Sequence, residues 1–82
     1  MGQVAGLGFV RLVVNAEDHP PPHVHVISGR GRGEIVVRIS LIDLMPLIGE
    51  GGRRSERAAK AAQRLVRAYY TGCCDEWNRL HG

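Results

Sequence analysis

The sequence predicts an α+β fold: a small antiparallel sheet of three to four strands, with one longer C-terminal helix and a short final helix packed on one face. Alternating residues in the runs 7–14, 23–28 and 34–40 predict the strands, because successive side chains in a strand point to opposite faces. A run with helical periodicity begins near Ser55 and predicts the longer helix.

Size and composition indicate one globular unit. We expect a single domain, 1–82, with a sheet part at 7–48 and a helical part at 55–81. A share of hydrophobic residues of 44% excludes a disordered chain. A chain this short buries only about 60% of the surface that its unfolded form exposes, so a partner or a homodimer would add stability. The sequence has neither a signal peptide nor an apolar run of about 18 residues, which predicts a cytoplasmic protein without membrane contact.

The strands 23–28 and 34–40 are separated by a turn rich in glycine. Residues 29–33 alternate glycine and arginine and provide the positive φ that a tight reversal needs, so we expect a hairpin. After it, Pro46 excludes a central strand, because proline lacks the N–H that the sheet requires. A fourth strand would therefore be a short edge strand near Leu47.

The longer helix is amphipathic. Ser55 is a capping hydroxyl, and the acidic residue after it lies near the positive end of the helix dipole. One face is apolar and should cover the sheet: Ala58, Ala62, Leu65, Val66 and Tyr69. Thr71 and Gly72 should end or bend this helix. A short final helix, 74–80, would then bring Trp77 into the core.

Cysteine and charge give weaker guidance to function. Cys73 and Cys74 are neighbours and lack the spacing of a zinc or redox pair, so we expect free thiols in a reducing compartment. The formal net charge of +3 permits an acidic partner, either nucleic acid or a carboxylate-rich protein surface.

Histidine and proline are concentrated between Asp18 and Val26. Consecutive prolines fix φ and remove backbone donors, which predicts a rigid, extended spacer. Beyond it, His23 and His25 should point the same way about 7 Å apart, close enough to share one Zn²⁺ ion or another divalent transition metal. His19 could be a third ligand, and Asp18 a fourth ligand or a hydrogen-bond partner of one. The alternative is that these histidines are surface and packing residues of the hairpin.

The same histidines could instead carry out acid–base catalysis. Imidazole titrates near neutral pH, so His19, His23 and His25 could divide the roles of general acid and base on a phosphodiester, with or without a metal. The phosphate could be bound by Arg30, Arg32 or Arg38. That would make the protein a small nuclease or phosphodiesterase.

A third candidate site is a basic ridge on the outer face of the longer helix. It consists of Arg57, Lys60, Arg64 and Arg67, which Arg53 or Arg54 would extend. Together with Arg30 and Arg32, the ridge could hold successive phosphates of a nucleic acid or dock on an acidic partner protein. The alternative is an ordinary charged helix face exposed to solvent.

The run from Asp18 to His25 resembles the motif of a family of small prokaryotic proteins, the domain of unknown function DUF4160. That motif has an acidic or amide residue, His, a spacer, two prolines, His, a hydrophobic residue and His. The likeness continues at Gly31, 35–39, Gly49, Arg53 and Trp77. Val24 departs from it, because the family often has an aromatic residue there. The resemblance implies a module that acts with a cognate small protein in a toxin–antitoxin-like gene pair, and it implies no chemistry.

Overall fold

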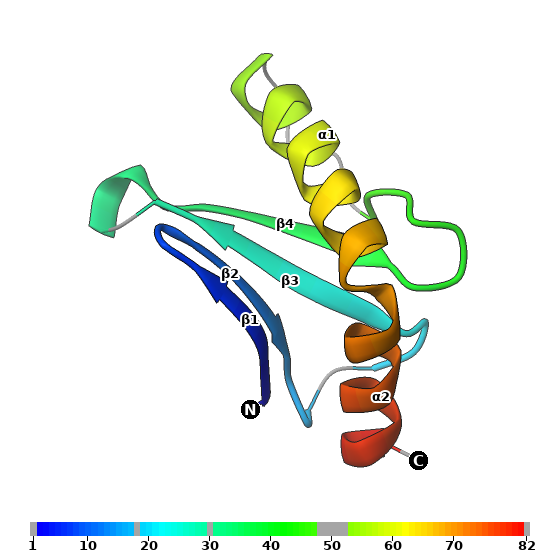
Figure 1. Ribbon diagram of the computed structural model, residues 1–82. Helices are drawn as coiled ribbons and strands as arrows, with labels where there is room; N and C mark the ends of the chain where they lie inside the picture. The colour runs from blue at the N-terminus through cyan, green and yellow to red at the C-terminus, as the bar shows by residue number, and fades with distance from the viewer. Residues whose placement is uncertain (1, 18, 30, 48–52, 82) are drawn as a thin grey trace.

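The computed structural model describes residues 2–17, 19–29, 31–47 and 53–81, without the side chains of residues 32 and 53–55. Figure 1 shows one sheet with two helices on one of its faces. The strands are β1 (Gly2–Leu7), β2 (Val10–Val14), β3 (His23–Ser28) and β4 (Ile35–Ser40), antiparallel in the order β1-β2-β3-β4. A short 3-10 helix, η1 (Gly31–Gly33), precedes β4, and the helices are α1 (Arg53–Ala68) and α2 (Tyr70–His81). The predicted α+β fold is confirmed.

The sheet begins earlier than its sequence pattern indicates. The run 7–14 contains the end of one strand, a turn and a second strand, because Gly8 has a φ of 64° and reverses the chain between β1 and β2. β1 is rich in glycine and alanine, residues with little strand propensity, so it gave no alternating signal. With β1, the sheet has four strands, the larger number that the sequence predicted. Near Leu47 the described chain forms only an isolated bridge, between Ile39 and Pro46.

The hairpin between β3 and β4 agrees with the prediction. Its register runs from His23 opposite Ser40 to Ser28 opposite Ile35. Gly29 has a φ of 85°, and a Cβ at this position would lie 2.7 Å from a backbone oxygen across the turn. Only glycine fits such a backbone conformation in such a space.

The core lies between one face of the sheet and the two helices. Its buried members are Leu12, Val14, Val24, Val26, Val37, Ile39, Leu41, Ala62, Val66, Cys73 and Trp77. Leu65, expected on the face that covers the sheet, is partly buried against this cluster, and so is Ile35. Tyr69, in contrast, is 37% exposed, because the chain passes from α1 to α2 at this residue. The prediction of Tyr69 as a core residue was wrong.

The break between the helices lies at Tyr69 rather than at Gly72. The Tyr69 N–H donates to the Leu65 carbonyl over 3.0 Å, and the Tyr69 carbonyl accepts from the Cys73 N–H over 3.0 Å, so helical hydrogen bonding continues across it. Gly72 lies inside α2, where a Cβ would come within 3.1 Å of Cγ1 of Val4. Glycine at this position lets α2 lie close to β1.

α1 begins at Arg53, before the predicted cap Ser55. Its buried side, with Ala62 and Val66, faces the sheet as expected. Among the residues that the structure describes, no helix has the length and apolar character needed to cross a membrane.

Candidate functional site

Two of the predicted site histidines lie side by side at the start of β3. They are alternate residues of this strand, and their ring centroids are 5.2 Å apart. His23 is only 6% exposed, and its Nδ1 lies 2.8 Å from the carbonyl oxygen of Pro21. The chain bends at Pro21, which a cis peptide bond joins to Pro20, instead of running extended. His19 is exposed.

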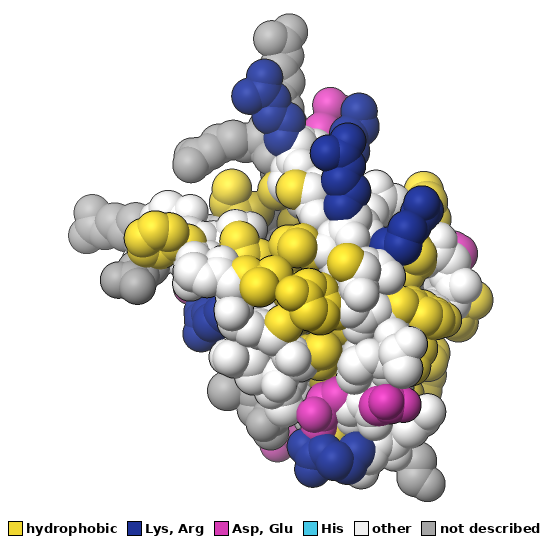
Figure 2. All heavy atoms as spheres, in the orientation of Figure 1, with side chains coloured by type: hydrophobic (Ala, Val, Ile, Leu, Met, Phe, Trp, Pro, Cys, Tyr) yellow, Lys and Arg dark blue, Asp and Glu magenta, His cyan; other side chains and the backbone are white. Residues whose placement is uncertain are grey.

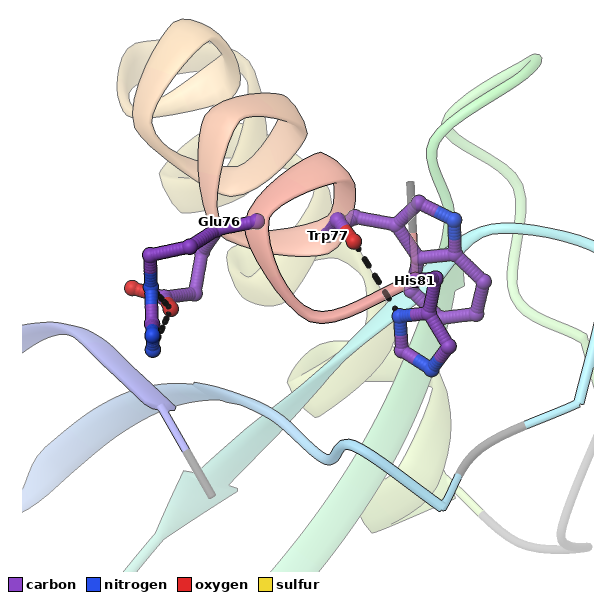
Figure 3. A network of polar contacts seen from close by, with 4 residues as sticks. Glu76, Trp77 and His81 are labelled. Atoms are coloured by element: carbon purple, nitrogen blue, oxygen red, sulfur yellow. Dashed lines mark hydrogen bonds and ion pairs between the residues drawn. The ribbon is translucent and has the colours of Figure 1, made fainter.

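Trp77 of α2 connects this pair to a further histidine. The His23 and Trp77 rings are 5.6 Å apart and tilted, while His81 stacks on Trp77 with centroids 3.7 Å apart and an angle of 17° (Figure 3). The Nδ1 of His81 is 3.1 Å from the carbonyl oxygen of Trp77. We refer to His23, His25, Trp77 and His81 as the ring cluster. His81 was not predicted as a member, although its spacing of four from Trp77 on a helix indicates such a contact.

The ring cluster differs from the predicted metal site. Among the described residues His19 takes no part in the ring contacts, and Asp18 lies outside the described residues. Within the described part of the chain, no group of three or more His, Cys, Asp and Glu side chains is placed to hold a metal ion. Because Asp18 is one of its members, the set of His19, His23, His25 and Asp18 stays a prediction.

Catalysis by these histidines also stays a prediction. A general acid or base must reach its substrate, and the low exposure of the His23 ring leaves it little access. The structure brings His23 and His25 together, while His19 is separate from their ring contacts. Of the arginines expected to bind phosphate, Arg38 is half-buried on β4 opposite His25; Arg30 and the side chain of Arg32 lie outside the described part.

The basic ridge lies along α1. Figure 2 shows dark-blue basic side chains following this helix, and no histidine is visible among the described side chains on that face. All four members are exposed: Arg57, Lys60, Arg64 and Arg67. The side chains of Arg53 and Arg54, its predicted extension, are not described. The ridge and the ring cluster therefore do not form one site.

The segment 41–47, after β4, is held in place beside the ridge. The Gln63 side chain of α1 donates from Nε2 to the Leu44 carbonyl over 2.9 Å. The Tyr70 hydroxyl donates to the Leu41 carbonyl over 2.7 Å. This segment therefore has a defined conformation set by side chains of both helices.

That conformation exposes large apolar side chains. Ile42 is 71% exposed and Met45 is 54% exposed. Between them, Leu44 has a φ of 61°, in the left-handed region that residues other than glycine rarely adopt. Such a conformation costs on the order of 1–3 kcal/mol, and residues of this kind cluster at binding sites and switches. Ile42 and Met45 were not predicted as site residues, because apolar residues without a clear period give no sign of exposure.

Two adjoining pockets lie where this segment meets the helices. One of about 280 Å³ is lined by Asp43, Leu44, Met45, Lys60, Gln63, Arg64 and Arg67. The other, of about 320 Å³, is lined by Ile42, Asp43, Leu44, Arg67 and Tyr70. We refer to these lining residues together as the loop–helix surface. Its basic groups outnumber its one carboxylate, Asp43.

Tyr70 also connects this surface to the two cysteines. The pKa of Tyr70 is raised by a hydrogen bond with Cys74 and by the negative charge that Cys74 carries as a thiolate. Burial raises the pKa of Cys73 to about 11, with a smaller effect of Cys74. Both cysteines are free thiols, as predicted, and Cys73 is completely buried. Cys73 is therefore a core residue, since the reactive thiolate form is disfavoured there.

Comparison with known proteins gives one match. A model of the family described as "Domain of unknown function (DUF4160)" matches residues 8–78. No curated protein and no solved structure matches the chain. The matched range contains the whole loop–helix surface and most of the ring cluster, and it leaves out His81 and all of β1.

Proposed function

We propose that this chain, which belongs to the family of the domain of unknown function DUF4160, is the partner-binding member of a toxin–antitoxin-like pair and binds its cognate small protein through the loop–helix surface. The observation that carries the proposal is the position of Ile42 and Met45. These exposed apolar side chains are held on a hydrogen-bonded segment directly beside basic residues of α1.

The apolar part of this surface would supply affinity. Fully burying an isoleucine or methionine side chain contributes about 1.5–3 kcal/mol. With 71% of Ile42 and 54% of Met45 exposed, covering both would contribute about 2–4 kcal/mol. The segment that carries them is already ordered by Gln63 and Tyr70, so binding would not have to fix its conformation.

The basic part would select an acidic partner. Lys60, Arg64 and Arg67 surround one pocket and attract carboxylates, which increases the rate of association and makes it sensitive to salt. The exposed apolar residues, together with the carboxylate of Asp43, favour a protein over the phosphate backbone of a nucleic acid. The expected partner segment presents acidic side chains around one or two apolar residues.

The proposal is tested by coexpressing the chain with the product of the neighbouring gene and measuring their affinity by calorimetry. We expect a complex that the double variant Ile42→Ser/Met45→Ser weakens about 30- to 800-fold. The matched control is Val36→Ser, which removes an apolar side chain, 40% exposed, from β4 outside the loop–helix surface. An affinity equal for the double variant and the control would refute the proposal.

A second double variant, with its own control, tests the basic part of the loop–helix surface. Lys60→Gln/Arg64→Gln should weaken the complex at low salt and reduce the dependence of its affinity on salt concentration. Arg11→Gln is the control, because Arg11 pairs with Glu34 on the sheet. Binding of nucleic acid by the chain, with no affinity for the neighbouring gene product, would instead support the alternative function of the ridge.

A further inference from the structure

β1 is an edge strand whose outer side is open. It lies at the edge of the sheet and pairs with β2 alone (Figure 1). No described residue hydrogen-bonds to its outward backbone groups. The other edge, β4, is partly covered, since the Leu47 N–H donates to the Arg38 carbonyl over 2.9 Å and Pro46 bridges to Ile39. The sequence of β1, Gly2–Leu7, has neither the charged residues nor the proline that usually protect a sheet edge. The fold thus covers one edge and leaves the other available for pairing.

The side chains of β1 are arranged so that the strand can pair with a copy of itself. Its register with β2 places these residues on the face of the sheet that carries the core: Gly2, Ala5 and Leu7, the last of which is exposed. It places Gln3 and Gly6 on the opposite face. A bulge lies between Gln3 and Ala5, and Val4 also packs against the core. Bulges often prevent two sheet edges from pairing. In β1, however, the bulge makes the sequence of side-chain faces symmetric: read from Gly2 or from Leu7, it is core, opposite, core, core, opposite, core.

We propose that two copies of this chain pair through β1 in antiparallel orientation, about a twofold axis at the Val4–Ala5 peptide, to form one continuous sheet. In that register Leu7 of one copy lies opposite Gly2 of the other, and Gln3 lies opposite Gly6. Each long side chain therefore meets a glycine, and facing residues lie on the same face of the sheet, as antiparallel pairing requires. A self-complementary surface of this kind is typical of a twofold dimer.

The helices leave room for this arrangement. α2 contacts both β1 and β2, and Gly2 and Gly72 allow it to lie close to β1. Neighbouring strands are about 4.8 Å apart, so the twofold axis would lie about 2.4 Å outside β1. A helix above the midline between β1 and β2 lies about 2.4 Å inside β1, and therefore about 5 Å from that axis. The two copies of α2 would then be about 10 Å apart, at the upper end of the usual distance between packed helices. The dimer would therefore form without displacing either helix.

Light scattering on the chain tests the proposal, with a predicted mass of twice the 9.0 kDa of one copy. The double variant Gln3→Lys/Leu7→Lys should be a monomer, because it places lysines of both copies along the shared edge. Both positions are exposed, so folding should be retained, which circular dichroism checks. Val36→Lys, a lysine on the opposite edge strand, is the control and should remain a dimer.

A measurement on the unmodified chain makes the test independent of any variant. Hydrogen exchange at the β1 amides should slow as the protein concentration rises through the range in which the mass doubles. A mass of one copy throughout the micromolar range would overturn the inference, as would an unchanged dimer in the lysine variant. Neither result would affect the loop–helix surface, because the inference does not depend on the proposed function.

Discussion

Tyr70→Phe removes a hydrogen bond that holds segment 41–47 against the helices. The Tyr70 hydroxyl donates to the Leu41 carbonyl over 2.7 Å, and Leu41 is only 4% exposed, so the change leaves a buried acceptor without its donor. Such a loss costs about 1–2 kcal/mol in the free energy of unfolding. For a domain of this size, we expect the melting temperature to fall by about 5–10 °C.

The change should also act locally. The Leu44 N–H donates to the Ser40 carbonyl over 2.9 Å, and hydrogen exchange at this amide reports opening of the segment. A loss of 1–2 kcal/mol should accelerate that exchange by about 5- to 30-fold. Binding of the partner should weaken by up to the same factor, because the segment would have to be ordered again.

Tyr69→Phe is the matched control for this prediction. Tyr69 is the preceding residue and is similarly exposed, but its hydroxyl forms no hydrogen bond with the described residues. Its loss should change the free energy of unfolding by less than about 0.5 kcal/mol. Equal melting temperatures for the two variants, with unchanged exchange at Leu44, would refute the role assigned to the Tyr70 hydroxyl.

Two further predictions concern the fold. Gly29→Ala should lower the free energy of unfolding by about 2–4 kcal/mol in chemical denaturation, because it combines a φ of 85° with a backbone oxygen 2.7 Å from the new Cβ. Gly31→Ala, with a φ of 56° and open space, should cost only about 1–2 kcal/mol, and equal losses would contradict the steric argument. For Cys73, the pKa raised from 9.0 to about 11 means that the folded state keeps the thiol proton after the unfolded state has lost it. This contribution to stability is complete below pH 9 and is lost as the pH rises to 11, by about 2–3 kcal/mol. Unfolding curves of Cys73→Ala should lack this decline, and equal slopes for both proteins would contradict it.

The elements with a regular pattern were predictable from the sequence. Alternation at residues 23–28 correctly predicted a strand, β3, and the glycines of the following turn predicted the hairpin. β1 was missed because glycine and alanine contribute little to an alternating signal. Gly72 looked like a helix end, but it serves close packing against β1, which depends on a contact distant in sequence.

The candidate site was predictable only in part. The ridge on α1 follows from helical spacing alone, so its exposure could be foreseen. The exposure of Ile42 and Met45 could not be foreseen. It results from hydrogen bonds that Gln63 and Tyr70, which are distant in sequence, donate to segment 41–47. The stacking of His81 on Trp77 was accessible from their spacing on one helix.

Chemical-shift mapping by NMR tests most directly whether the loop–helix surface binds the partner. The isotope-labelled chain is titrated with the unlabelled product of the neighbouring gene, and shifts of backbone amides are recorded. We predict that the largest changes occur in segment 41–47 and between Lys60 and Tyr70 of the helices. Changes confined to β1 or to the ring cluster, or no change at all, would contradict the proposed function.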